Sequence, residues 1–118
     1  MITCKTPRVE EELDLLPAEL RALLDDFGHW SMSNRLPMTV VTCIKRTPKE
    51  NRDIYGYDRD SLHLDARALD LRTRQYTKTQ LDDVIRFFET KCRDRKIWEL
   101  VTRLHGTGPH IHVGLRKP

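Results

Sequence analysis

The run His110-Ile-His112-Val113 near the end of the chain most constrains the fold, because polar and apolar residues alternate in it. Side chains two positions apart on a β-strand lie on the same face of the sheet. The alternation therefore predicts a strand whose two imidazoles face one way while Ile111 and Val113 face the core. A sheet with one apolar face and one polar face follows from this strand.

A second run, Ala66-Arg-Ala-Leu-Asp-Leu71, shows the same alternation. Leu69 and Leu71 fall on one predicted face, and Ala68 and Asp70 fall on the other. The β-branched run from Thr39 to Ile44 predicts a buried strand. Two further strands are expected at residues 97–104 and 110–115, joined by a turn at 105–109.

Helical patterns occupy three other stretches. Pro17 suits the first position of a helix that is expected to end at Gly28. A short helix is expected from Thr47 to Gly56. Thr77-Lys-Thr-Gln80 is a capping box, and the helical spacing after it continues to about Arg93. Residues 1–16 are expected to form an ordered arm or loop. The order of elements predicts an α+β fold with helices beside a small, mostly antiparallel sheet.

The composition fits one globular domain of 118 residues with a net charge of +3. The longest apolar runs fall short of the roughly 18 residues that span a bilayer. The N-terminal residues lack the apolar stretch of a secretory signal, which predicts synthesis in a cytosol. An extracellular target would then be reached by another route, such as host lysis. The cysteines at positions 4, 43 and 92 are widely spaced and are interpreted as reduced, small, buried side chains.

Histidine and aspartate residues in two separate runs suggest a metal site. The spacing of His110 and His112 allows one imidazole to bind a metal while the other lies beside the remaining coordination position. His63 and Asp70 lie seven residues apart and could come from one loop–strand unit. A catalytic zinc usually takes three protein ligands and leaves a fourth position open. Two ordinary surface histidines, and two solvated positions on one helix face, remain the alternatives.

Together, these runs carry a family resemblance. Ser61-x-His63-x4-Ala68-x-Asp70 followed by His110-x-His112 resembles the zinc D-alanyl-D-alanine metallopeptidases. That superfamily includes murein endopeptidases, L-alanyl-D-glutamate endolysins of phages and the hedgehog signalling domains. The similarity covers about residues 38–115 and implies a single metallopeptidase-like domain over 1–118, with a hedgehog-like fold.

The resemblance implies roles for individual residues. The Zn²⁺ ligands would be His63, Asp70 and His112, and the substrate carboxylate would contact Arg46 and Ser61. Ala66 stands where the family usually has glycine. Pro109 and Gly106 stand where many members carry a catalytic Glu or Asp, so the proton carriers expected here are His110 and, second, His105. Glu99 is a further candidate base.

The function expected from the resemblance is zinc-dependent cleavage of peptide bonds in peptidoglycan stem peptides or cross-links. The protein would be a carboxypeptidase or endopeptidase, with a phage lysis enzyme as one possibility. One alternative is a zinc-binding recognition module without catalysis. A second is a nickase that binds a metal through paired histidines and attacks DNA with a tyrosine, for which only Tyr55, Tyr57 or Tyr76 is available. Nucleic acid is therefore the less favoured partner.

Overall fold

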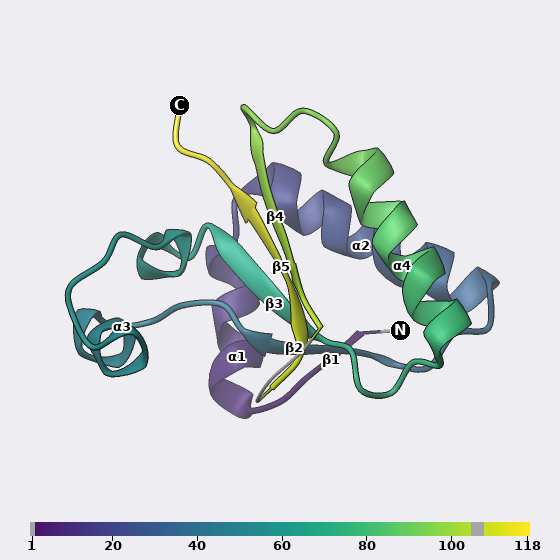
Figure 1. Cartoon of the computed structure of the whole chain (residues 1–118), viewed down its shortest axis with the longest axis horizontal. Helices are drawn as coiled ribbons and strands as arrows, with labels where there is room; N and C mark the ends of the chain where they lie inside the picture. The colour runs from purple at the N-terminus through teal and green to yellow at the C-terminus, as the bar shows by residue number, and fades with distance from the viewer. Residues whose placement is uncertain (1, 105–107) are drawn as a thin grey trace.

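The computed structural model describes residues 2–104 and 108–118, which form one five-stranded sheet with helices beside it (Figure 1). In chain order the elements are β1 (Ile2–Cys4), α1 (Pro7–Glu12), the 3₁₀ turn η1 (Leu13–Leu15), α2 (Ala18–Ser33), β2 (Thr39–Cys43), α3 (Pro48–Tyr55), the 3₁₀ turn η2 (Leu62–Asp65), β3 (Ala68–Arg72), α4 (Lys78–Lys91), β4 (Trp98–Arg103) and β5 (His110–Leu115).

The sheet has the order β1-β2-β3-β5-β4. β1 pairs with β2 in parallel, and the other three pairs are antiparallel. The predicted α+β class with a mostly antiparallel sheet is therefore confirmed. β5 lies between β3 and β4, so the two motif-bearing strands, β3 and β5, are direct neighbours.

One face of the sheet carries the hydrophobic core. Ile111 and Val113 of β5 are fully buried, as the alternation predicts, and Leu69 and Leu71 of β3 are nearly so. Helices α2 and α4 lie side by side and contribute the other half of this core (Figure 1). Their buried side chains are Leu20, Leu23, Leu24, Phe27, Val84 and Phe88. The helix α3 lies apart from α2 and α4, at the other end of the molecule (Figure 1).

Local signals explain where the shorter helices begin and end. Thr47 and Thr77 each accept a hydrogen bond from the backbone N–H three residues later, and Glu50 and Gln80 return the bond to the cap. The helices α3 and α4 thus each begin with a complete capping box. Gly56 ends α3 in the left-handed conformation, with a φ of 80°, which glycine adopts without steric cost.

Two expectations for the N-terminal third are wrong. Residues 1–16, expected as an ordered arm or loop, instead contain regular elements, because β1 pairs with β2, and α1 begins at Pro7 after a Thr6 cap. The second helix does not end at Gly28 but continues to Ser33. Gly28 is buried in the helix face that packs on the core, and this packing outweighs the cost of about 1 kcal/mol for an interior glycine.

Within the described residues, none of the helices has the length and apolar character needed to cross a membrane.

The capping box of α4 provides a test of the fold. We expect Thr77→Ala to lower the free energy of unfolding by about 1 kcal/mol, because it removes the side-chain acceptor from the start of a core helix. Thr79→Ala is the matched control, since Thr79 is exposed in the same helical turn. Urea denaturation of the two variants measures the difference, and equal stabilities would contradict the capping role.

Candidate metal centre

The face of the sheet opposite the α2–α4 core carries the polar side chains of both motifs. Asp70 of β3 lies directly opposite His112 of β5 in the strand register. Val101 of β4 pairs with His112 on its other side. The register between β2 and β3 shifts by one residue, and this bulge places Cys43 opposite Asp70. Asp70, His112 and Cys43 therefore share one face.

His63 reaches this face from the turn that precedes β3. The hydroxyl of Ser61 accepts the backbone N–H of His63 and caps η2. The backbone carbonyl of His63 accepts the N–H of Arg46, which ties the turn to the segment after β2. The side chain of His63 is 1% exposed. The interpretation of residues 63–70 as a loop followed by a strand thus agrees with the structure.

Two backbone features hold this turn against the sheet. Ala66 adopts the left-handed conformation, with a φ of 54° and a ψ of 34°. For a residue with a Cβ this conformation costs roughly 1–2 kcal/mol, which explains why a glycine is suited to the position. Gly114 lies two residues after His112, and a Cβ there would lie 2.6 Å from Cδ1 of Leu62. The missing side chain of Gly114 therefore makes room for the turn that carries His63.

Hydrogen bonds on the outer side of each imidazole determine which ring nitrogen is protonated. Nδ1 of His63 lies 2.7 Å from the carbonyl oxygen of Ile44, which can only accept, so this nitrogen carries the proton. Nε2 of His112 contacts the carboxylate of Glu99 and carries the proton for the same reason. In the neutral rings, the remaining nitrogens are Nε2 of His63 and Nδ1 of His112, each with a free lone pair.

These two nitrogens and one oxygen of Asp70 converge on a single point. Nε2 of His63 and Nδ1 of His112 each lie 3.1 Å from Oδ1 of Asp70, and the two nitrogens lie 3.2 Å apart. Three acceptors at such distances repel one another unless a proton or a cation lies among them. Ligand bonds of about 2.0–2.1 Å in a tetrahedral site give ligand–ligand distances of about 3.3 Å. The triangle therefore fits one face of a tetrahedral metal site.

The contact between His63 and Asp70 shifts the pKa values of the two side chains in opposite directions. Burial acts to lower the pKa of His63, but the hydrogen bond to Asp70, aided by Cys43, outweighs burial and raises it to about 10. Burial acts in turn to raise the pKa of Asp70, and the 3.1 Å contacts with His112 and His63 bring it below its usual range. A proton held between His63 and Asp70 thus takes the place of a cation.

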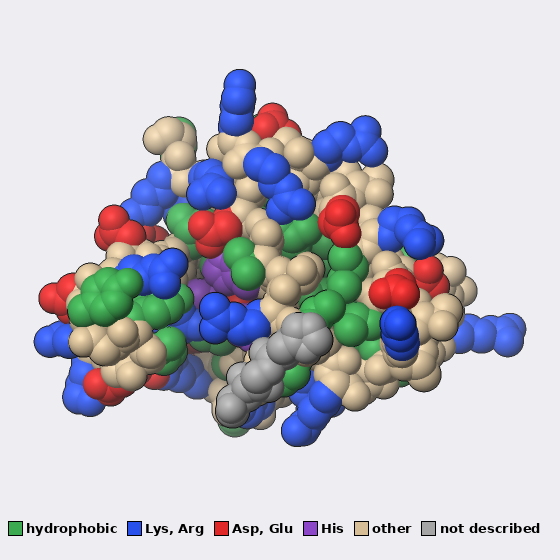
Figure 2. Space-filling view, in the orientation of Figure 1, with side chains coloured by type: hydrophobic (Ala, Val, Ile, Leu, Met, Phe, Trp, Pro, Cys, Tyr) green, Lys and Arg blue, Asp and Glu red, His purple; other side chains and the backbone are tan. Residues whose placement is uncertain are grey.

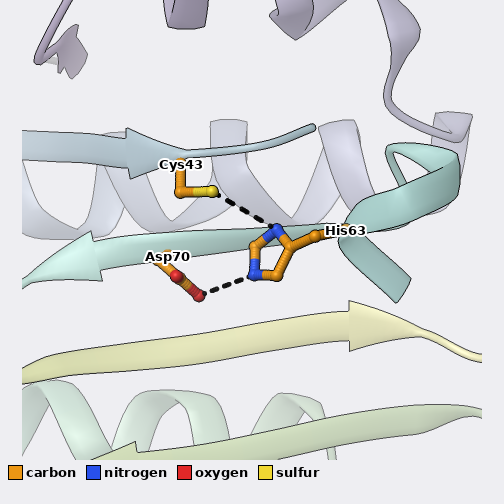
Figure 3. A group of neighbouring side chains, drawn as sticks. All are labelled: Cys43, His63 and Asp70. Atoms are coloured by element: carbon orange, nitrogen blue, oxygen red, sulfur yellow. Dashed lines mark hydrogen bonds and ion pairs between the residues drawn. The ribbon is translucent and has the colours of Figure 1, made fainter. Parts of the chain in front are cut away.

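Cys43 is a metal-capable neighbour that the sequence analysis did not include in the site. Its sulfur and the ligand atoms of His63 and Asp70 lie within 4.8 Å of one another, so this group could hold a metal ion. Figure 3 shows the His63 imidazole between the other two side chains, with one ring nitrogen toward each. The sulfur lies 3.7 Å from Nδ1, the nitrogen that donates to Ile44. Cys43 therefore lies on the outer edge of the ring, away from the triangle.

The two residues expected to contact substrate lie beside the triangle. Nη2 of Arg46 lies 3.6 Å from Oδ2 of Asp70, and its side chain is 14% exposed. Arg46 is therefore not a solvated loop charge. Ser61 caps η2 and also lines the cleft above the site. Both side chains line the cleft over the triangle.

The candidate proton carriers differ in their surroundings. Nδ1 of His110 lies 2.9 Å from the carbonyl of Gly108, so Nε2 faces the site at 4.0 Å from Oδ2 of Asp70. Glu99, expected as a candidate base, instead contacts His112 and Arg116. His105 lies outside the described residues. His110 is thus the described candidate with a ring nitrogen toward the site.

Comparison of the chain with protein families, curated proteins and solved structures finds no match in any of the three.

The spectrum of a cobalt-loaded protein can show whether His112 or Cys43 is the third metal ligand beside His63 and Asp70. We expect the spectrum to lack a thiolate-to-cobalt charge-transfer band, because the sulfur of Cys43 lies on the outer edge of the ring. Cys43→Ser should bind one cobalt ion per chain like the unmodified protein, whereas His112→Ala should lose it. A strong charge-transfer band that disappears in Cys43→Ser would instead assign the third ligand to Cys43.

Metal affinity should also depend on pH with a definite sign. A metal ion must displace the proton of His63, whose pKa is raised to about 10. The apparent affinity should therefore rise by about tenfold per pH unit across neutral pH and up to about pH 9. Competition with a chelator at several pH values measures this slope. An affinity that levels off above about pH 6.5, the ordinary pKa of histidine, would contradict it.

Proposed function

We propose that the protein is a zinc-dependent hydrolase that cleaves peptide bonds in peptidoglycan stem peptides or cross-links. The observation that supports this most is the triangle of His63, Asp70 and His112, in which the two ring nitrogens and the carboxylate oxygen lie 3.1–3.2 Å from one another. Two imidazoles and one carboxylate are a common ligand set for a catalytic zinc. The resemblance of the two motifs to the zinc D-alanyl-D-alanine metallopeptidases names the same three residues.

The ligand set suits hydrolysis at neutral pH. Two neutral imidazoles and one carboxylate would leave a bound zinc ion with a net charge of about +1, and such an ion would supply water whose pKa is lowered from about 15.7 to near 7. Glu99 accepts the outer proton of His112 and so orients the ring, as partners of metal-binding histidines commonly do. The carbonyl of Ile44 does the same for His63.

His110 is suited to move a proton at this site. Its Nδ1 is occupied by the carbonyl of Gly108, so the exchangeable position is Nε2, which faces Asp70. The side chain is 26% exposed, so it can exchange protons with solvent. Such a side chain can accept a proton from water and donate it to a leaving amine.

An open cleft of about 500 Å³ lies over the site and is rich in arginine. We call it the arginine cleft; its cationic lining residues are Arg46, Arg59, Arg95, Arg103 and Arg116. The carboxylates in its described lining are Asp60 and Glu99. Arginine binds carboxylates through two parallel hydrogen bonds, so this lining suits the carboxylates of stem peptides. Figure 2 shows histidine side chains in a hollow with Lys and Arg side chains around it.

One observation favours a second function, a zinc-binding recognition module without catalysis. Many members of the resembled family use a Glu or Asp as the base, and the carboxylate nearest the site here, Glu99, is engaged by His112 and Arg116. In such a module the same arginines would hold a wall fragment without cleaving it. The two functions differ in whether new peptide ends appear.

Digestion of purified peptidoglycan, followed by mass spectrometry of the released peptides, tests the proposal. We expect the zinc-loaded protein to produce new peptide ends, and His63→Ala to produce none because it loses zinc. His110→Ala should keep zinc and lose at least about 10²-fold in rate, the usual contribution of general acid–base catalysis.

His29→Ala is the matched control, because His29 is exposed on α2, beyond the opposite face of the sheet. It should cleave like the unmodified protein. Zinc-loaded protein that binds peptidoglycan but releases no peptides would favour the recognition module. A covalent adduct with single-stranded DNA would favour the nickase, and full activity in His110→Ala would remove His110 from the mechanism.

A further inference from the structure

A second basic pocket lies on the other side of the metal site from the arginine cleft. Its volume is about 380 Å³. Its cationic lining residues are Lys5, Arg72 and Arg74, and the pocket also includes Thr42 and the segment 108–110. Among the described residues that line it, the only carboxylate is Asp70, which belongs to the metal site. The described lining therefore has positive charge without a further carboxylate to neutralise it.

The order of the strands places the two hollows on opposite sides of the site. The second basic pocket is lined by Lys5, which follows β1, and by Thr42 of β2. The arginine cleft is lined by residues of β4, which forms the other edge of the sheet. Asp70 lines the second basic pocket, His63 lines the arginine cleft, and His110 lines both. The metal site thus lies at their common boundary.

The dimensions suit an extended peptide that crosses the sheet. Four strand-to-strand intervals from β1 to β4 span about 19 Å, and an extended chain of about six residues covers that length. A group held at the metal site would therefore have a cationic pocket on each side. Arginine and lysine side chains in such pockets form charge-assisted hydrogen bonds with carboxylates.

Resting on the proposed function, we infer that the substrate carries carboxylates on both sides of the bond that is cleaved, and that Lys5, Arg72 and Arg74 bind the second of them. Such a substrate extends past the metal in both directions. This favours cleavage within a chain or cross-link over the removal of a single terminal residue.

Single-stranded nucleic acid is the other polyanion that two basic hollows could accommodate. It usually requires aromatic side chains on which bases stack. Apart from the histidines, Tyr55 is the one aromatic residue among the described residues that line the two hollows. The guanidinium of Arg59 already lies over its ring, 4.5 Å from the ring centroid. An acidic peptide therefore fits these surfaces better.

A nuclear magnetic resonance titration with four synthetic hexapeptides tests the inference without requiring turnover. All four are blocked at both ends and have four central alanines, with glutamate or glutamine at the first and last positions. The peptide with two glutamates should bind about tenfold or more tightly than either peptide with one, and the peptide with none should bind weakest. It should shift the backbone amides of Arg72 and Arg74.

The double variant Lys5→Gln/Arg74→Gln removes two charges from exposed positions of the second basic pocket. It should bind the two-glutamate peptide no more tightly than the better one-glutamate peptide. The double variant Lys78→Gln/Arg93→Gln makes the same change in charge at exposed positions, one at the start of α4 and one just after its C-cap, and it should keep the preference. Should the first variant fail to fold, Lys5→Gln alone is compared.

Equal affinity for the one- and two-glutamate peptides would overturn the inference, as would the same preference in both double variants. Tighter binding of a ten-residue oligothymidylate, lost in Lys5→Gln/Arg74→Gln, would assign the pocket to nucleic acid instead. Peptidoglycan digestion and zinc content are measured on the same samples. Failure of the proposed function thus appears as absent zinc or absent cleavage, independently of the peptide affinities.

Discussion

The candidate site depends on two hydrogen bonds that direct the free lone pairs of His63 and His112 toward Asp70. Their acceptors are the carbonyl of Ile44, just after β2, and the carboxylate of Glu99, on β4. These groups come from segments far apart in the chain, so the orientation exists only when the sheet is assembled. The resulting cluster of acceptors is unfavourable by itself, because buried lone pairs repel one another without a proton or cation among them. Such a cluster is suited to holding a cation.

The division of the sheet into two faces allows the fold to tolerate such an unfavourable cluster. β5 alternates between Ile111 and Val113 in the core and His110 and His112 on the other face. Packing against α2 and α4 therefore stabilises the strand independently of the histidines. The aromatic contacts between these helices, such as Phe27 with Phe88 at 4.7 Å between ring centroids, belong entirely to the core face. The polar face can therefore carry side chains, such as His110 and His112, that contribute little to the stability of the fold.

Local patterns in the sequence predict the elements that have a clear period or cap, and long-range register accounts for the rest. Alternation predicts β3 and β5, and the Thr77–Gln80 box predicts the start of α4. The three-residue β1 is too short to show a period, and the position of Cys43 beside the site depends on a bulge in β2. The contact between Glu99 and His112 likewise depends on how β4 pairs with β5, which no local pattern specifies.

The two oxygens of Asp70 connect the parts of the proposed mechanism. Oδ1 faces the imidazoles of the triangle, whereas Oδ2 faces Arg46 at 3.6 Å and His110 at 4.0 Å. The Arg46 guanidinium beside Oδ2 withdraws electron density from the carboxylate, which would make Asp70 a weaker donor to a bound cation and leave that cation more acidic. A substrate carboxylate that draws Arg46 toward itself would relax this effect. In the proposed function, one buried side chain would therefore couple substrate binding, metal acidity and the proton carrier, so their contributions to catalysis should not be additive.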